Sequence, residues 1–318
     1  MKKALVTGIT GQDGSYLTQH LLRIGYEVLG SSSSRVPNLR NIEALGIKHE
    51  VPIVSLNIQD PETVDRFLLK HKPTHIFSLG SLSSVGVSFL NPDLAESSIF
   101  HSTKVFLESI ARINPETKFF HPSSSEMFGD TDSNAHEDSP CKPVSPYGVW
   151  KMKSHQLVRQ AREINGLSCV SGILFNHESP LRGNDFFTRK LISGAVDIYL
   201  GKKNSLEFGN LDGVRDWGWA PDYVEVMELI INQDDLRDFV VATGVGHSLH
   251  FLVAETFSIL GLDWEKYVQI DQSRFRPHDI KRSVGDPTNA EKYLPWKNSK
   301  SIQQILKLLV ESELSRCV

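Results

Sequence analysis

A tyrosine and a lysine stand four residues apart near the middle of the chain, in the segment Tyr147-Gly148-Val149-Trp150-Lys151. At this spacing two side chains lie on one face of a helix, and Pro146 before Tyr147 is typical of a helix N-terminus. A nearby ammonium favours the tyrosinate and lowers the pKa of Tyr147, which can then act as a base near neutral pH. Because most Tyr-x-x-x-Lys pairs lie on solvated helix faces, the surrounding elements must decide whether this pair does chemistry.

A hydroxyl and a carboxylate precede that pair, in the segment Pro122-Ser123-Ser124-Ser125-Glu126-Met127-Phe128-Gly129. The segment follows a predicted strand, and strand ends at the carboxyl edge of a parallel sheet face the ligand crevice. There Ser124 can hydrogen-bond a substrate hydroxyl, and Glu126 is a candidate base for a proton bound to carbon. The alternative is that the serines cap a turn and Glu126 is a surface charge.

A glycine-rich loop follows the first predicted strand, and its sequence is Gly8-Ile9-Thr10-Gly11-Gln12-Asp13-Gly14. Glycines at this spacing let the backbone turn tightly and approach a pyrophosphate, which then lies at the N-terminus of the next helix. Glycine triplets alone are weak signals, but this one has the required strand before it and helix after it. We therefore predict a dinucleotide site, with an ordinary tight turn as the alternative.

The end of the second predicted strand indicates which dinucleotide binds. An NAD site usually has an acidic residue there, which holds the ribose 2′-hydroxyl. Here the strand runs into Ser31-Ser32-Ser33-Ser34-Arg35, which offers hydroxyls and a guanidinium but no acid. This chemistry suits a 2′-phosphate and favours NADP, unless the segment is only a solvated serine loop.

The elements that position these residues follow from an alternation of short β-rich runs with helix-like segments. The predicted strands are Ala4–Thr7, Glu27–Gly30, Pro52–Leu56, His75–Leu79, Lys118–Pro122, Ser168–Phe175 and Phe239–Thr243. The predicted helices are Ser15–Ile24, Pro61–His71, Leu94–Ile113, Tyr147–Ile164 and Phe186–Leu200. This order predicts an α/β fold, a Rossmann-like doubly wound parallel sheet with a smaller, discontinuous C-terminal substrate domain.

We expect the chain to return to the sheet near Asp216–Gly244. The predicted domains are therefore residues 1–175 plus about 212–256, which bind the dinucleotide, and about 176–211 plus 257–318, which bind the substrate.

Composition limits the classes of partner and the compartment. The chain has 318 residues and a formal net charge of -4, which argues against a broad nucleic-acid-binding surface. Its three cysteines, Cys141, Cys169 and Cys317, have neither disulfide-framework nor metal-ligand spacing. No apolar run approaches the roughly 20 residues of a membrane span, and the start does not resemble a signal peptide. We expect a cytoplasmic protein with no metal site and no membrane or nucleic-acid partner.

Several longer blocks give the chain a family likeness. They are Gly8 to Leu17, Gly172 to Pro180 with its Asn-His-Glu-Ser-Pro core, Thr188-Arg189-Lys190, Gly209-Asn210-Leu211-Asp212, Arg215-Asp216-Trp217-Gly218, Phe275-Arg276-Pro277 and Gly285-Asp286-Pro287. From about Ala4 to Pro295 the chain resembles the GDP-mannose 4,6-dehydratase family of extended short-chain dehydrogenases. The Asn-His-Glu-Ser-Pro block is far more specific than the glycine loop.

The resemblance implies a role for each matching residue. The implied catalytic residues are Ser124, Glu126, Tyr147 and Lys151. The implied cofactor-binding residues are Gly8, Ile9, Thr10, Gly11, Gln12, Asp13, Arg35, Asn57, Ile58, Leu79, Gly80, Ser81, Ser83, Tyr147, Lys151, His177 and Arg182. The implied substrate-binding residues are Asn176, Glu178, Lys190, Arg215, Arg276 and Asp279. Lys190, Arg215 and Arg276 are also reasonable cations for a diphosphate on chemical grounds alone.

The chain departs from the family pattern around the cofactor and the active-site floor. Ser124 replaces a threonine, and the family's Arg-Arg-Ser-Ser after strand two reads Ser33-Ser34-Arg35-Val36, followed by a shorter loop. The family's Asp-Leu after strand three is replaced here by Asn57-Ile58, and its Ala-Gln-Ser-His is replaced by Ser81-Leu82-Ser83-Ser84.

The resemblance implies a lyase that uses NADP to dehydrate a GDP-hexose to the GDP-4-keto-6-deoxy sugar. GDP-mannose is the leading candidate for this substrate. We expect transient oxidation at C4 with Tyr147 as base, elimination across C5–C6 with Glu126 as base, and hydride return to C6. The alternatives are a GDP-sugar 4-reductase or epimerase, and a catalytically silent NADP-binding regulator. Extended enzymes of this kind commonly pair through helices that flank the active site, here Leu94–Ile113 and Tyr147–Ile164. The family's tetramer depends on the loop after strand two, which is shorter here, so we expect a homodimer.

Overall fold

The computed structural model describes residues 2–34, 36–275 and 278–317. Its larger part is a parallel sheet with the strand order β10-β6-β5-β4-β1-β2-β3. These strands are β1 (Lys3–Thr7), β2 (Glu27–Ser32), β3 (Ile53–Ser55), β4 (His75–Ser78), β5 (Lys118–Ser124), β6 (Cys169–Leu174) and β10 (Phe239–Val241). Apart from the edge strand β3, their central residues are buried and mostly apolar, as expected for a sheet covered on both faces.

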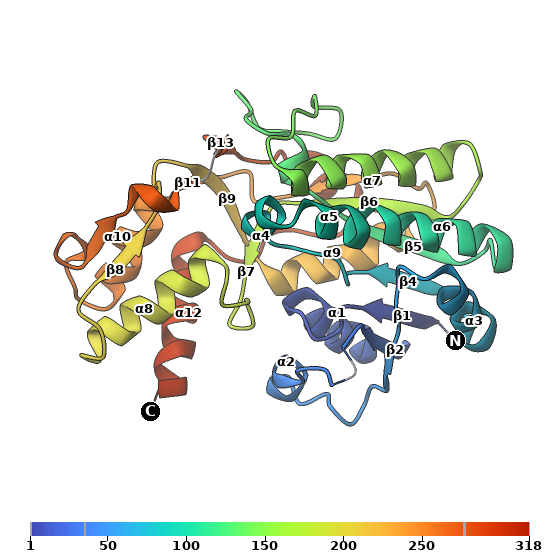
Figure 1. The fold of residues 1–318 in the computed structure, drawn as a ribbon, viewed down its shortest axis with the longest axis horizontal. Helices are drawn as coiled ribbons and strands as arrows, with labels where there is room; N and C mark the ends of the chain where they lie inside the picture. Colours follow the sequence, from blue (N-terminus) through green and yellow to red (C-terminus); the bar gives the residue numbers. More distant parts are fainter. Residues whose placement is uncertain (1, 35, 276–277, 318) are drawn as a thin grey trace.

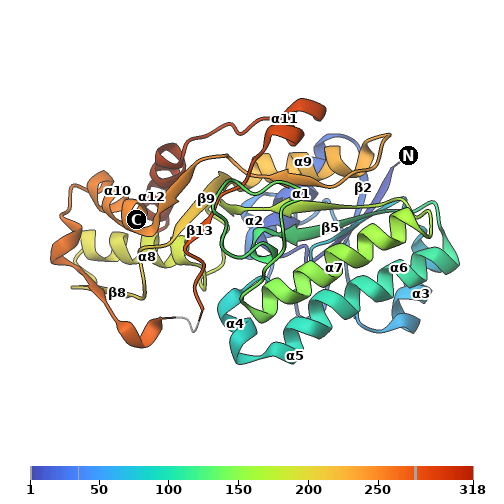
Figure 2. The same ribbon diagram turned by 90° about the horizontal axis from the view of Figure 1, so that it is seen from above.

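Helices cover both faces of this sheet (Figures 1 and 2). One face carries α1 (Gln12–Arg23), α2 (Arg40–Ala44), α9 (Ala220–Asn232) and α11 (Thr288–Tyr293). The other carries α3 (Pro61–His71), α4 (Val85–Leu90), α5 (Pro92–Ala95), α6 (Ser102–Ile113) and α7 (Pro146–Glu163). The predicted Rossmann-like, doubly wound fold is confirmed.

The predicted helix over Leu94–Ile113 is interrupted. A π-helical turn, Glu96–His101, separates α5 from α6. Within it the hydroxyl of Ser98 donates to the carbonyl of Leu94 at 2.6 Å and accepts the backbone N–H of Leu82 at 3.3 Å. Periodicity cannot show one extra residue per turn, and here the wide turn holds the loop that follows β4.

A smaller part of the chain lies beside the carboxyl edge of the sheet (Figure 1). Its helices are α8 (Phe187–Tyr199), α10 (Leu249–Ile259) and α12 (Ile302–Cys317), and they enclose an apolar core of their own. Its strands are β7 (Asn176–Glu178), β8 (Leu206–Phe208), β9 (Val214–Trp219), β11 (Gly246–Ser248), β12 (Val268–Ile270) and β13 (Arg282–Ser283). The chain returns to the large sheet through β10, whereas β9 pairs with β7, β11 and β13.

The chain also crosses between the two parts near its end. Ala290, Leu294 and Trp296 are buried in the core of the large sheet, although α12 belongs to the smaller part. Among the described residues, no helix is both long enough and apolar enough to cross a membrane.

Candidate active site

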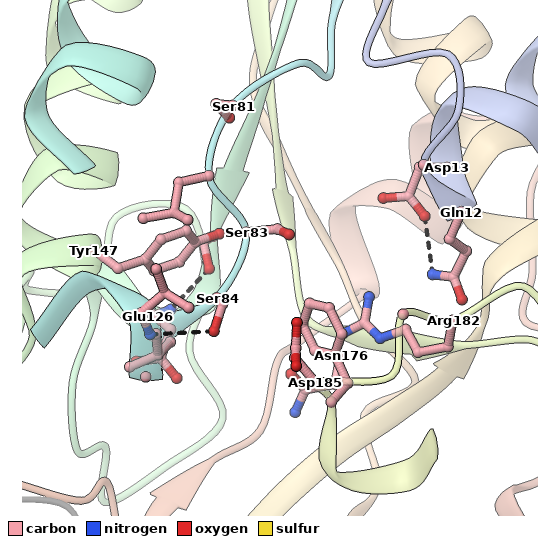
Figure 3. A pocket seen from close by; sticks show the side chains of 18 of the residues that line it. Gln12, Asp13, Ser81, Ser83, Ser84, Glu126, Tyr147, Asn176, Arg182 and Asp185 are labelled. Atoms are coloured by element: carbon pink, nitrogen blue, oxygen red, sulfur yellow. Dashed lines mark hydrogen bonds between the residues drawn. The ribbon is translucent and has the colours of Figure 1, made fainter. Parts of the chain in front are cut away.

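A cleft of about 1100 Å³ separates the carboxyl edge of the large sheet from the smaller part of the chain. Its floor lies where the strand order reverses, between β1 and β4, which is where doubly wound sheets bind ligands. Figure 3 shows Tyr147 and Glu126 on one side of this cleft, with Gln12, Asp13 and Arg182 on the other. The site therefore joins residues from widely separated parts of the sequence.

The loops after β1 and β4 touch at the floor of the cleft. Gly8 has a φ of +65°, and a Cβ there would lie 2.6 Å from the carbonyl oxygen of Leu79. The hydroxyl of Thr7 accepts the N–H of Gly80 at 2.9 Å. Only glycine combines that backbone conformation with such a close approach, which explains the glycine directly after β1.

The first turn of α1 fits a pyrophosphate. Gly11 precedes the helix, and no side chain among the described residues caps it, so the N–H groups of the first turn remain available to an anion in the cleft. A dinucleotide bound here would be held by the glycine loop on one side and by the Leu79–Ser83 loop on the other. The geometry fits the group that the sequence predicts.

The four predicted catalytic residues come from β5, the turn after it and α7. Ser124 ends β5, and its hydroxyl accepts the N–H of Glu126 at 3.3 Å. Ser145 caps α7 by accepting the N–H of Gly148 at 3.0 Å, with Pro146 in the first turn. These local structures bring Ser124, Glu126 and Tyr147 to the same wall of the cleft.

Lys151 is buried beneath Tyr147. Its Nζ donates to the carbonyl of Pro122 at 2.6 Å and lies 5.5 Å from the centre of the Tyr147 ring. Burial lowers the pKa of Lys151 to about 7, against an opposing effect of the Asp13 carboxylate. Lys151 can thus gain or lose a proton near neutral pH.

The pKa of Tyr147 differs from the sequence expectation. Burial raises it above the usual value for tyrosine, and a hydrogen bond with Ser124 and the charge of Arg182 only partly oppose that effect. The predicted lowering by Lys151 is wrong for the free protein, because desolvation of the phenol outweighs the charges around it. Tyr147 is therefore a neutral phenol until a ligand changes its surroundings.

The opposite wall joins the start of α1 to β7. The Nε2 atom of His177 lies 3.0 Å from both carboxylate oxygens of Asp13. Gln12 donates to the carbonyl of His177 at 3.1 Å and accepts the hydroxyl of Ser179 at 2.7 Å. Burial alone would raise the pKa of Asp13, but His177, Arg182 and Gln12 together lower it to about 2. Asp13 is thus a fixed negative charge.

A buried carboxylate holds one cation in the cleft. Glu178 is 1% exposed, accepts the hydroxyl of Thr188, and lies 3.4 Å from the Nε atom of Arg182. The guanidinium of Arg182 stacks on the ring of Phe186, 3.7 Å from its centre. Burial raises the pKa of Glu178, while Arg182 and Thr188 oppose that effect. Phe186 and Thr188 were not predicted as site residues, because only the folded chain brings Phe186 to Arg182 and Thr188 to Glu178.

Two further cations line the substrate end of the cleft. Lys190 lies on α8, and Arg215 lies on β9 with its Nη2 atom 3.4 Å from Asp279. Asn176 and Asp279 line the same cleft. These residues can hold an anionic group of the substrate beside the catalytic wall.

Most of the predicted site residues meet in this cleft, with four exceptions. Ile9 is fully buried and packs against Gly30 instead of lining the cleft. Asn57 is exposed, is absent from the cleft lining, and accepts the N–H of Gln59 at 3.1 Å. Its neighbour Ile58 does line the cleft. Arg35 and Arg276 lie outside the residues that the structure describes.

Comparisons with known proteins agree with this geometry. Residues 5–309 match the family model described as GDP-mannose 4,6 dehydratase. The chain is 38% identical to GDP-mannose 4,6 dehydratase 2 of Arabidopsis thaliana, over 98% of this chain and 87% of the plant protein. It is 36% identical to the human GDP-mannose 4,6 dehydratase, over 98% of this chain and 91% of that one.

Among solved structures, the fold is similar to a UDP-glucose 4-epimerase of Thermotoga maritima with UDP-glucose. The TM-score is 0.88 and the identity 23%, over 99% of this chain and 100% of that one. The resemblance and the lyase class predicted from the sequence are thus confirmed. The chain belongs to the GDP-mannose 4,6 dehydratase family.

Proposed function

We propose that this protein dehydrates GDP-mannose to its GDP-4-keto-6-deoxy sugar, using NADP. The observation that carries the proposal is the position of Glu126, a carboxylate on the same cleft wall as Ser124 and Tyr147. Oxidation at C4 alone needs only the hydroxyl, phenol and ammonium. Elimination of water also needs a base for the C5 proton, and Glu126 supplies it.

Each residue then has one task. Tyr147 accepts the proton of the sugar 4-hydroxyl, Ser124 orients that oxygen, and Lys151 supplies charge beneath the phenol. Glu126 removes the C5 proton, which the new ketone has made acidic, and passes a proton to the departing C6 hydroxyl. A nicotinamide dinucleotide bound in the cleft supplies the acceptor for a hydride and returns it to the sugar.

The substrate diphosphate binds Lys190 and Arg215, with Arg276 as a third predicted cation. Asn176, Glu178 and Asp279 supply polar contacts to the rest of the nucleotide sugar. The domain division predicted from the sequence, with one part for NADP and the other for the sugar nucleotide, is part of the same proposal. So is a homodimer that pairs through α5, α6 and α7.

The test is incubation with GDP-mannose without added reductant, followed by mass spectrometry of the nucleotide sugar. A product lighter by one water supports the proposal, and the Glu126→Gln variant should form it far more slowly. Product that appears only with stoichiometric NADPH and a keto-sugar would identify a 4-reductase. An isomer of unchanged mass would identify an epimerase.

NADP should bind more tightly than NAD, because Ser31, Ser32 and Ser33 line the cleft at the end of β2 where NAD-binding enzymes have an acid. Each charge-assisted phosphate contact is worth on the order of 1–3 kcal/mol. Calorimetry with both dinucleotides measures the preference. Ser32→Asp should weaken NADP binding and spare NAD, whereas equal affinities in the wild type would contradict the assignment.

A further inference from the structure

A row of buried polar side chains lies behind Lys151, between α7 and strands β5 and β6. His121 on β5 is 2% exposed, and the residue paired with it on β6, Ser171, is fully buried. Ser154 on α7 is also fully buried. The rest of this layer is an apolar core that includes Phe119 and Val158. Polar groups are costly in such a layer unless they have hydrogen-bond partners.

Four atoms in this row have no hydrogen-bond partner among the described residues. They are Nε2 of His121, Oγ of Ser154, Nδ1 of His155 and Oγ of Ser171. Buried polar atoms are almost always satisfied by protein or by ordered water. Because no described residue pairs with these four atoms, water is the partner that remains for them.

His121 has a defined orientation at the inner end of the row. Its Nδ1 atom lies 3.5 Å from the hydroxyl of Thr103, which donates to the carbonyl of Ile99 at 2.7 Å. Nδ1 must then carry the ring proton, so Nε2 presents a lone pair. Burial lowers the pKa of His121 well below its usual value, and the charges of Lys151 and His155 act in the same direction. A neutral imidazole with a free acceptor atom therefore lies close to Lys151.

His155 connects the row to the surface. Its Nε2 atom lies 3.9 Å from Asp238 and its Nδ1 atom is buried. It lines a second cavity of about 500 Å³, together with Arg159, Arg162 and Asp238. Burial lowers the pKa of His155, Asp238 raises it, and the two arginines lower it. One face of this ring thus meets the interior, and the other meets the cavity.

The proposed reaction creates a need for such a route, and the inference rests on that reaction. The hydride leaves C4 and returns to C6, so electrons balance within the sugar. Tyr147 gains the O4 proton, and the C5 proton leaves with the C6 hydroxyl as water. When hydride returns to C6, C5 takes a new proton from cleft water through Glu126. After each turnover one proton has thus entered at Glu126, and the O4 proton that remains on the Tyr147–Lys151 pair has to leave.

We propose that His121, Ser154, Ser171 and His155, bridged by water, carry this proton from Lys151 to the second cavity. The route needs no oxidant or co-reactant, because only a proton moves. It leaves through the layer behind α7, away from the cleft that holds the substrate. His121 and His155 are positioning and relay residues in this proposal and do not touch the substrate.

The experiment compares the first turnover with the steady state in His121→Gln and His155→Ala. Each variant is first equilibrated with NADP, so that any loss of the phenol proton of Tyr147 on cofactor binding is complete before the sugar is added. The first turnover should then keep its wild-type rate, because the route is needed only for the O4 proton that Tyr147 takes up in that turnover. The steady-state rate should fall by at least about 10²-fold, the low end for loss of proton-transfer help. Imidazole added to His155→Ala should restore turnover in a saturable way, because the second cavity gives it access.

His75→Gln is the matched control, since His75 is a buried histidine on β4 outside the row. It should leave both phases unchanged, and thermal unfolding should show that all variants are folded. Unchanged steady-state rates in both relay variants would overturn the route, as would an equal loss in both phases without imidazole rescue. If the wild type forms no dehydrated product, the proposed function itself fails, and the proton balance fails with it.

Discussion

At the scale of single residues, Glu126 separates dehydration from plain oxidation. Glu126→Gln keeps the size of the side chain and its hydrogen bonding but cannot accept a proton. We expect dehydration to slow by about 10²–10⁴-fold, while oxidation at C4 continues. Reduced-dinucleotide absorbance should therefore appear on mixing with GDP-mannose and decay slowly.

Tyr147→Phe is the informative comparison, because it blocks the first oxidation and should show little absorbance at any time. Wild-type turnover by Glu126→Gln would remove the main mechanistic support for a dehydratase. If neither variant differs from the wild type, the reaction takes place elsewhere.

Lys151 makes the stability of the protein depend on pH. Its pKa is about 7 when folded, compared with the ordinary lysine value of 10.5. Between those values the unfolded chain binds more protons, so the burial of Lys151 destabilises the fold most at pH 7 and progressively less as pH rises toward 10.5. Lys151→Met should therefore be more stable than the wild type at pH 7, by on the order of a few kcal/mol.

Urea unfolding at intervals between pH 7 and 10 measures this effect. The advantage of Lys151→Met should shrink steadily as pH rises, although the variant should be inactive throughout. A constant difference across the window would mean that Lys151 keeps its ordinary pKa in the fold.

At the scale of elements, Asp216 ties β9 to two other segments. Fully buried, it accepts the N–H and hydroxyl of Thr243, at 2.8 and 2.7 Å, and the N–H groups of Gly244 and Gly285, at 2.9 and 3.3 Å. The neighbouring residue on β9 is Arg215, which faces the cleft. Asp216 thereby fixes the strand that presents a substrate cation.

Asp216→Asn turns an amide donor toward these N–H groups. We expect a loss of about 2–4 kcal/mol in unfolding free energy and a raised KM for GDP-mannose.

Burial raises the pKa of Asp216 to about 6, and the hydrogen bonds that the carboxylate accepts oppose this shift. In the wild type, the contribution of Asp216 to the free energy of unfolding should thus fall as pH rises from 3.8 to about 6, and it should stay constant above pH 6.

Denaturant unfolding and steady-state kinetics check both effects. Asp212→Asn, at an exposed position just before the same strand, should change neither. Wild-type stability in Asp216→Asn would show that the strand is held by other contacts.

The elements also show what sequence could and could not predict. The strands, the glycine loop and the Tyr147–Lys151 spacing follow from local patterns, which is why they were predicted with small errors at their ends. The contact of His177 with Asp13 joins residues 164 positions apart, and no local pattern specifies it. Burial of Ile9 and the raised pKa of Tyr147 likewise depend on the packed surroundings of each side chain.

At the scale of the whole molecule, the helical face made by α5, α6 and α7 is the predicted dimer surface (Figure 2). Leu94 is 40% exposed there, and the half-buried rings of Phe100 and Trp150 lie 5.6 Å apart beside it. Exposed apolar groups on one face favour association. Light scattering at micromolar concentration should therefore give the mass of a dimer.

Leu94→Glu should shift that mass toward the monomer, because it would bury a charge at the interface. Leu69→Glu places the same charge at an exposed site on α3 and should leave the dimer intact. A monomeric wild type would exclude this assembly.

The contacts of Gln12 and Asp13 with His177 and Ser179 also determine how this protein can be recombined with its relatives. Consider a chimaera that takes the glycine loop from one parent and the substrate-binding half from another. If the junction is chosen at the end of β6, it falls at Phe175. That junction would divide all three hydrogen-bonded pairs, Asp13–His177, Gln12–His177 and Gln12–Ser179, between two parents. A junction placed after Arg182 keeps them in one parent, together with the contact of Asn41 with Leu181. The segment that must come from one parent to preserve these contacts therefore extends past β6, to Arg182.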